Sequence, residues 1–426
     1  MSDDPGPHIS LSQYYRLVRG NTEFRRLWLA QIVSELGDWF YAVAVFDLIL
    51  RLTGSARLIG AAVLLHILPF FFVGPTAGAV NDRVSRRAVM IAADLIRAVI
   101  VLGMLWVDTR EQLWLLYVLL AAEMGTAAFF EPARTAAIPN LVREGQVITA
   151  NALSSATWSF MLAVGAGVGG LAVHWLGRSS AFVINSASFL GSAALLARMR
   201  LHEPHLEQHK GVGWKEILGL HPIREGISYV KRDAKLLSML LLKCGLGAIT
   251  ANLVLLPIMG NREFRSGGSS VLGMSTLFMM RGVGALGGPF LGARLAGSSQ
   301  ARMRLGVLGG FLTAGVFYLL FSRAPTLALA SACVAGAHAG ASVVWVFSTT
   351  LLQLNTEDRF RGRVFAADFA LLTLSSALAA YAVGFAVDRG VPPRATALAL
   401  GLAMFVPAAA WALALRLWRR SGVVDK

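Results

Sequence analysis

Twelve long apolar stretches, separated by short polar segments, constrain this chain more than any other feature. A helix needs about 20 mostly apolar residues to cross a bilayer core about 30 Å thick. The stretches span residues 27–50, 58–80, 88–107, 113–130, 148–176 and 180–197 in the first half, and 236–259, 271–296, 305–321, 327–352, 364–387 and 395–417 in the second. They predict an all-α integral membrane protein with twelve transmembrane helices in two pseudo-symmetric six-helix bundles.

The polar segments divide the chain further. We expect a cytoplasmic N-terminal segment at 1–26, a six-helix bundle at 27–197, a cytoplasmic linker with an amphipathic helix at 198–235, a second bundle at 236–417 and a cytoplasmic tail at 418–426. The first segment contains acidic residues and lacks the order of a cleaved signal peptide, so we expect the first apolar stretch to be retained. Three histidines at 202–209 are more typical of a solvated linker than of a metal site.

The formal net charge of +15 would favour a nucleic-acid partner if the chain were soluble. However, only 15% of the residues are charged and 56% are hydrophobic, which is unlike an average soluble enzyme. Of the 39 basic residues, 27 fall on the side of the termini and linker, 9 on the opposite side and 3 inside the stretches. This asymmetry predicts cytoplasmic termini, because Lys and Arg concentrate in cytoplasmic loops. The partner is then the lipid bilayer and not nucleic acid.

Several motifs indicate a family. Residues 78–87, Gly-Ala-Val-Asn-Asp-Arg-Val-Ser-Arg-Arg, resemble the Gly-x-x-x-Asp-Arg-x-x-Arg-Arg loop of the major facilitator superfamily. The segments 129–142, 150–153 and 361–364, together with Gly37-Asp38, resemble the superfamily's drug and siderophore exporters, which include macrolide and enterobactin exporters. The glycine run at 165–170 lies where antiporters of the superfamily carry a glycine-proline motif, but it contains no proline. The resemblance covers nearly the whole chain.

The resemblance implies a gate on the cytoplasmic side, around the loop at 78–87. A small residue at Gly78 permits close helix approach, and Asp82 can accept hydrogen bonds from a helix N-terminus and an arginine. Asp94 and Arg97, three residues apart, can pair within one helix and support the gate. The gate residues that we expect are Gly78, Asp82, Arg83, Arg86, Arg87, Asp94 and Arg97.

Ionisable side chains inside a membrane are costly and usually functional. Several such residues lie well inside the stretches by the helical rise, and six of them are candidates for a functional site. The resemblance implies that the first, fourth, seventh and tenth helices line a central cavity, and the six include residues of all four. The candidates for the substrate and proton site are Glu35, Asp38, Glu123, Lys243, Arg281 and His338. The alternative is that the charged members form buried ion pairs that only fix helix register, and that His338 is a packing residue.

The resemblance and these ionisable residues together predict a secondary active transporter. We expect it to export amphipathic small molecules, drug-like or siderophore-like, in exchange for protons, as a monomer in the bacterial inner (plasma) membrane. A lysophospholipid flippase of the same superfamily is the alternative, because such transporters are similar at Gly37-Asp38 and after the fourth stretch. No common catalytic motif occurs in the sequence, and we expect neither enzymatic activity nor catalytic residues. We expect no metal and no cofactor, with the proton gradient as the energy source. Cys244 and Cys333 lie in apolar stretches and predict no disulfide framework.

Overall fold

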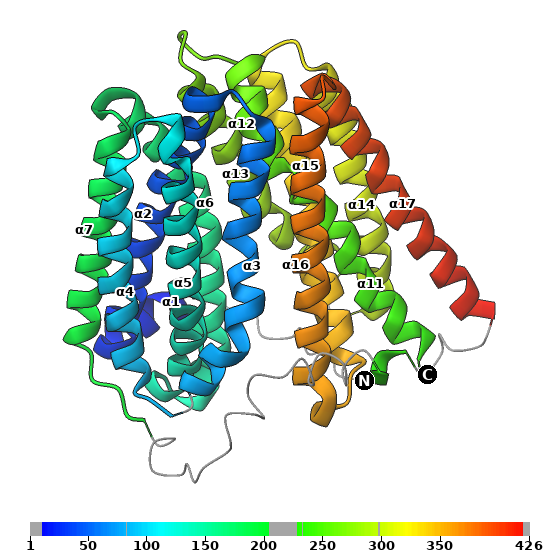
Figure 1. Ribbon diagram of the computed structural model, residues 1–426. Helices are drawn as coiled ribbons and strands as arrows, with labels where there is room; N and C mark the ends of the chain where they lie inside the picture. Colours follow the sequence, from blue (N-terminus) through cyan, green and yellow to red (C-terminus); the bar gives the residue numbers. More distant parts are fainter. Residues whose placement is uncertain (1–10, 82, 204–227, 232, 297–298, 421–426) are drawn as a thin grey trace. The chain divides into compact units, whose positions relative to one another are not determined.

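The computed structural model describes residues 11–81, 83–203, 228–231, 233–296 and 299–420. Their secondary structure is almost entirely helical (Figure 1). The first part contains α1 (Leu11–Gly20), α2 (Thr22–Thr53), α3 (Ala56–Asn81), α4 (Arg86–Gly103), α5 (Leu113–Leu141), α6 (Val147–Leu176) and α7 (Arg178–Ala197). Short 3₁₀ turns lie at Met104–Trp106, Arg110–Gln112 and Glu144–Gln146. The second part contains α11 (Ala234–Ile249), α12 (Asn252–Arg262), α13 (Ser270–Ala296), α14 (Gln300–Arg323), α15 (Leu327–Leu354), α16 (Asp358–Asp388) and α17 (Pro393–Arg420).

Among the residues that the structure describes, eleven helical segments are long and apolar enough to cross a membrane. The all-α membrane fold is therefore confirmed, although the expected count was twelve. The missing one is α2, which is 32 residues long but contains Glu35, Asp38 and Asp47. These charged side chains lower its mean hydropathy, although its length is ample for a crossing. We treat α2 as membrane-spanning with the other eleven.

The apolar residues of these segments face outward as well as inward. The most apolar window of α3 is only 28% buried, and so is that of α17. A soluble protein would hide such residues, whereas a membrane protein leaves them for the lipid. Large apolar side chains such as Trp106, Trp175 and Phe290 are accordingly exposed. The chain is therefore a multi-pass membrane protein.

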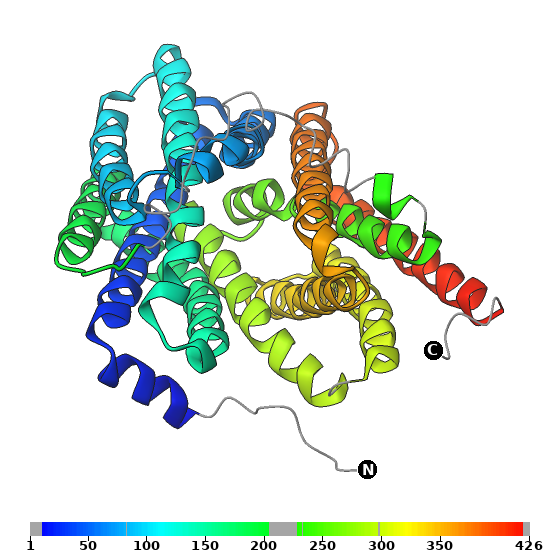
Figure 2. The same cartoon turned by 90° about the horizontal axis from the view of Figure 1, so that it is seen from below.

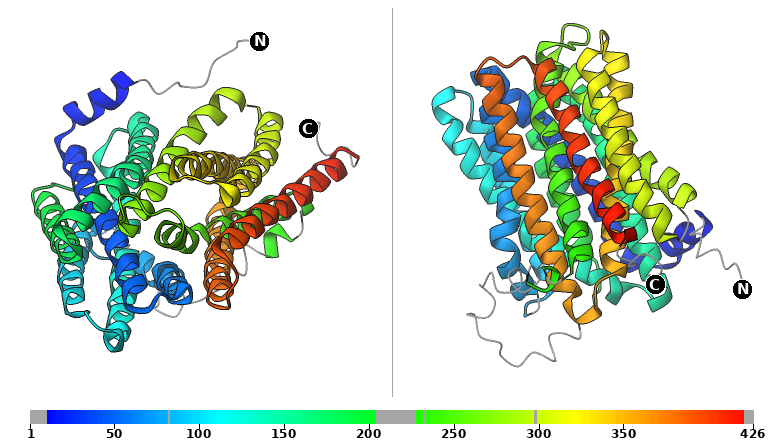
Figure 3. Two further views of the ribbon diagram at one scale, coloured as in Figure 1. Left: turned by 90° about the horizontal axis from the view of Figure 1, so that it is seen from above. Right: turned by 90° about the vertical axis from the view of Figure 1, so that its right-hand side faces the viewer.

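The chain forms two compact units. Unit 1 comprises residues 1–54 and 65–219, and unit 2 comprises residues 55–64 and 220–426. In unit 1, α2 packs on α6 and α7, and α4 packs on α5 and α7 (Figure 2). In unit 2, α15 packs on α13 and α14, α17 packs on α14, and α11 packs on α16 (Figure 3). The proposed amphipathic helix at 198–235 falls largely on residues outside the described ones, and the expected domain boundaries stay a prediction. The expected N-terminal segment at 1–26 contains a helix, α1, that was not predicted.

The first turns of α3 belong to unit 2. The expected first bundle, at 27–197, included the whole of this helix. The carboxylate of Asp388, at the end of α16, accepts hydrogen bonds from the backbone N–H groups of Ala56 at 2.7 Å and Arg57 at 3.2 Å. It therefore caps the N-terminus of α3, whose first amides have no partner within their own helix. Gly384 allows the approach, because a Cβ there would lie 2.5 Å from the carbonyl oxygen of Ala56.

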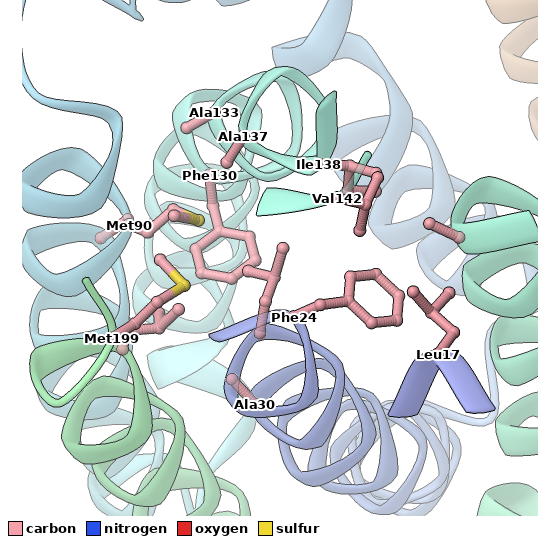
Figure 4. Close-up of a cluster of buried hydrophobic side chains, with 14 residues drawn as sticks. Leu17, Phe24, Ala30, Met90, Phe130, Ala133, Ala137, Ile138, Val142 and Met199 are labelled. Carbon is pink, nitrogen blue, oxygen red and sulfur yellow. The ribbon is translucent and has the colours of Figure 1, made fainter. Parts of the chain in front are cut away.

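An apolar cluster fixes three helices of unit 1 against one another. Phe24 of α2, Met90 of α4 and Phe130 of α5 are each at most 3% exposed and pack together with Met199 (Figure 4). These three helices also carry the buried charges described below. The cluster therefore holds the helices that position those charges.

Close packing of α13 on α15 depends on glycine. A Cβ at Gly284 would lie 2.1 Å from the carbonyl oxygen of Ala335, whereas a Cβ at Gly287 would have nothing within 4 Å. Small residues let membrane helices approach this closely.

We predict that Gly284→Ala destabilises the protein by about 1–3 kcal/mol, because the two backbones must move apart. The matched control is Gly287→Ala in the same helix, which should leave stability unchanged or raise it by up to about 1 kcal/mol, since alanine favours helix. Melting temperatures of the purified variants in detergent measure the difference. Equal melting temperatures for the two variants would contradict this packing.

Candidate functional site

One arginine and three carboxylates meet inside unit 1. The Arg97 guanidinium of α4 lies 2.7 Å from a carboxylate oxygen of Glu123 on α5 and 3.2 Å from both carboxylate oxygens of Asp38 on α2. Asp94, one turn before Arg97, lies 3.9 Å away. The ring of Phe189 covers the guanidinium at 4.0 Å. We call Asp38, Asp94, Arg97 and Glu123 the Arg97 cluster.

The Arg97 cluster has more acids than its one cation can neutralise. The side chains of Asp94 and Glu123 are fully buried, and Arg97 is 5% exposed. Both oxygens of Asp94 and Oε2 of Glu123 make no hydrogen bond. Asp38 is the accessible member, with its side chain 33% exposed. Because carboxylates held together resist full ionisation, this arrangement is suited to taking up and releasing a proton.

Glu35 belongs to a different group of polar residues. It accepts a hydrogen bond from Gln31 at 2.8 Å, and Gln31 in turn accepts one from Arg134 at 3.1 Å. Arg134 also pairs with Glu131 at 2.8 Å. Glu35 and Asp38 lie one turn apart on α2, but Asp38 pairs with Arg97, whereas Glu35 is connected to Arg134 through Gln31. The reason is tertiary, since Arg134 comes from α5 and Arg97 from α4.

Lys243 of α11 is paired inside unit 2. Its ammonium group lies 3.6 Å from Asp368 of α16, donates to the Thr349 hydroxyl at 2.9 Å and lies 3.8 Å from the centre of the Trp345 ring. Lys243 is 2% exposed. The positive charge is therefore neutralised locally by an acid from a helix far along the chain.

The two remaining candidates lie elsewhere in unit 2. His338 of α15 is hydrogen-bonded to Asn252 at 2.9 Å and to the Val334 carbonyl at 3.0 Å. Arg281 of α13 makes no ion pair within the part of the chain that the structure describes, and its Nε and Nη1 are buried without a hydrogen-bond partner. Within unit 1, Asp38 and Glu123 share Arg97 and Glu35 does not; within unit 2, Lys243 pairs with Asp368 and His338 with Asn252.

The expected gate residues also separate. Arg86 donates to the Ala136 carbonyl at 2.9 Å, and Arg87 donates to the Leu196 carbonyl at 3.0 Å. Both arginines therefore bond to main-chain carbonyl groups near the C-terminal ends of α5 and α7, where a positive charge is favourable. Arg83 lies in the turn that follows α3, and Asp82 lies outside the described residues.

Two observations bear on the other expected gate residues. A Cβ at Gly78 would meet nothing within 4 Å, so no neighbouring helix packs against it in this structure. Asp94 and Arg97 lie 3.9 Å apart on one helix, as expected, and Arg97 also bonds to Glu123 and Asp38. An isolated pair three residues apart cannot reveal that acids on two other helices reach the same guanidinium.

Sequence reasoning missed the partners of these charges. Asp368 and Thr349 hold Lys243, and Asn252 holds His338. The signal for Asp368 was present, since it is an acid within an apolar stretch, and such residues usually have a partner. Nothing in the sequence says which distant helix supplies that partner.

Two bacterial proteins match this chain at low sequence identity. The chain is 24% identical over 371 residues to macrolide efflux protein A of Streptococcus pyogenes, covering 86% of this chain and 90% of that protein. It is 29% identical over 229 residues to the MFS-type transporter YfiS of Bacillus subtilis, covering 54% of each. The chain therefore matches only about half the length of YfiS.

The fold has counterparts among solved structures. The crystal structure of the nucleoside transporter NupG superposes with a TM-score of 0.71 at 14% identity, covering 92% of this chain and 98% of that one. The sequence profile described as Major Facilitator Superfamily matches residues 27–380. These matches confirm the expected family. The family and the proteins matched here are membrane transporters and not enzymes. The chain belongs to the Major Facilitator Superfamily and is a membrane transporter.

Proposed function

We propose that this protein exports amphipathic small molecules, drug-like or siderophore-like, from the bacterial cytoplasm across the inner membrane in exchange for protons. The observation that carries the proposal is the Arg97 cluster, in which three acids share one arginine within membrane-spanning helices. The name of the relative in Streptococcus pyogenes, a macrolide efflux protein, supports export of an amphipathic compound. The basic residues at the termini and linker support cytoplasmic termini.

In this scheme, a proton changes which carboxylates pair with Arg97. When Asp38 is ionised, its carboxylate ties α2 to α4 through Arg97. A proton on Asp38 removes that charge pair and leaves Arg97 with Glu123, which ties α4 to α5. The two protonation states therefore bond different pairs of helices. A proton gradient can bias such an equilibrium between two conformations of a transporter.

Glu35 provides a second acid in the same unit. Its Oε2 is buried without a hydrogen-bond partner, while its other carboxylate oxygen accepts from Gln31. We assign Glu35 to the proton path between the Arg97 cluster and the cytoplasmic ends of the helices. Gly78, Asp82, Arg83, Arg86 and Arg87 close the cytoplasmic side in this proposal. Arg86 and Arg87 support it through their bonds to helix carbonyls.

Coupling to protons can be tested directly in proteoliposomes. We expect the uptake of amphipathic compounds into the proteoliposomes to depend on an imposed pH gradient and to stop when an ionophore collapses that gradient. Transport that is identical with and without the gradient, across a panel of amphipathic compounds, would exclude proton antiport.

Asp38→Asn should lower gradient-driven transport by about tenfold or more, because the coupling free energy carried by its charge is lost. Exchange of substrate down its own gradient should persist. The matched control is Asp108→Asn, which removes an exposed acid that pairs with Arg178 at the surface. Melting temperatures establish that both variants fold. Unchanged gradient-driven transport in Asp38→Asn would contradict the assigned role.

The Lys243–Asp368 pair has a structural role in this proposal, because it is neutral as a whole. Lys243→Met alone leaves a buried carboxylate unpaired and should cost about 3–5 kcal/mol of stability. Adding Asp368→Asn should recover most of that loss and keep transport. Melting temperature and proteoliposome transport are the two measurements. A double variant that is stable but inactive would show that the pair takes part in transport.

A further inference from the structure

A break in the seventh expected span brings polar side chains together in unit 2. Between α11 and α12, the amides of Thr250 and Ala251 bond to the carbonyls three residues earlier, Gly247 at 3.0 Å and Ala248 at 3.2 Å. Such tightening is typical of a functional bend in a helix. It places Asn252 against His338 of α15, and the ring of Tyr318 on α14 packs on His338 at 6.2 Å. We call Asn252, Arg281, Tyr318 and His338 the Arg281 cluster.

The histidine of this cluster has no free nitrogen. Its Nδ1 is 3.0 Å from the Val334 carbonyl, which can only accept, so Nδ1 carries the proton. Its Nε2 therefore accepts from the Asn252 amide at 2.9 Å. The role of His338 in this geometry is to hold Asn252, and it is satisfied in the neutral form. The proton-carrier role considered for His338 gains no support.

Four buried polar atoms of the cluster make no hydrogen bond. They are Nε and Nη1 of Arg281, the hydroxyl oxygen of Tyr318 and Oδ1 of Asn252. Asn252, Tyr318 and His338 are at most 5% exposed. Arg281 lies close enough for its charge to act on both Tyr318 and His338. Because buried polar groups are normally paired, so many unpaired atoms in one cluster indicate a missing partner.

The chemistry of the missing partner follows from the charge. Three cations lie well inside the predicted spans, and Arg97 and Lys243 both have carboxylates beside them. Arg281 has no carboxylate within ion-pair distance among the residues that the structure describes. A guanidinium in a membrane interior requires a negative charge, which water cannot supply. Arg281 is half-buried and its Nε and Nη1 are themselves buried, so an anion that pairs with them has to enter from the exposed side of the residue.

We propose that the Arg281 cluster is a subsite for an anionic group, a carboxylate or a phosphate, carried by the transported molecule. Arg281 donates to the anion through Nε and Nη1, and the Tyr318 hydroxyl adds a neutral donor. This inference rests on the proposed export function and narrows its substrates to amphipathic molecules with a negative charge. The lysophospholipids of the alternative function share this chemistry with soluble phosphates and carboxylates.

The test is a binding measurement on the purified full-length protein in a neutral detergent without any gradient. The matched probes are lauroyl-glycerol 3-phosphate and monolauroylglycerol, which differ only in the phosphate, with glycerol 3-phosphate as a probe that lacks the acyl chain. We expect the phosphate-bearing lipid to raise the melting temperature at concentrations where monolauroylglycerol does not. A response to glycerol 3-phosphate as well assigns the site to anions in general, and a response to the lipid alone assigns it to charged amphiphiles.

Variants separate this site from unspecific effects of a charged lipid. Arg281→Gln should weaken the response by about tenfold or more, whereas Arg281→Lys should keep part of it, since lysine retains the charge. The control is Arg323→Gln, an exposed arginine at the end of α14, which should respond as the wild type does. If Arg281→Gln fails to fold, the comparison of the two lipids on the wild-type protein decides by itself whether the protein recognises the phosphate.

Two results would overturn the proposal. One is a wild-type protein that does not distinguish the phosphate-bearing lipid from monolauroylglycerol. The other is an Arg281→Gln variant that folds and responds like the wild type. Either result leaves proton-driven export intact, because that function fails only if transport is independent of the pH gradient.

Discussion

Neutralisation of charge within the membrane is the constraint on which this structure depends. A charged side chain in hydrocarbon is costly unless a partner lies beside it. In unit 1, Arg97 meets this requirement with three acids on three helices, and in unit 2 Lys243 meets it with Asp368. The bonds between distant helices therefore follow from the placement of charges. Because Asp38 and Glu123 join Arg97 of α4 to two different helices, a change in their protonation alters which helices are tied together.

Close helix packing makes these bonds possible. Gly284 lets α13 approach the backbone of α15, and the apolar cluster around Phe24 and Phe130 fixes α2, α4 and α5. The break between α11 and α12 interrupts the helix instead of packing it, and it places Asn252 against His338 of α15. Rigid contacts and one local bend thus produce two polar sites, one rich in acids and one with an unpaired cation. The first suits a proton, and the second suits an anion.

Part of the site was predictable from the sequence. Four ionisable residues stand out in apolar stretches of the sequence: Asp38, Glu123, Lys243 and Arg281. In the structure the first three form ion pairs, and Arg281 has buried nitrogen atoms without a hydrogen-bond partner. Their grouping was not predictable, as Glu35 and Asp38 show. These two residues are neighbours on α2, yet Asp38 accepts from Arg97 of α4, whereas Glu35 accepts from Gln31, which in turn accepts from Arg134 of α5. Spacing along one helix indicates a shared face but says nothing about which neighbouring helix meets it.

The sequence by itself determined the fold class and the family. Its apolar stretches are close to or above the length that a bilayer crossing requires, and the superfamily profile matches residues 27–380 of the chain. Only the tertiary structure decided that Arg97 belongs with Asp38 and Glu123, that Asp388 caps α3, and that no acid among the described residues pairs with Arg281. The physical reason is that hydropathy is a local property that any helix displays alone. The pairing of charges depends on contacts between residues tens to hundreds of positions apart.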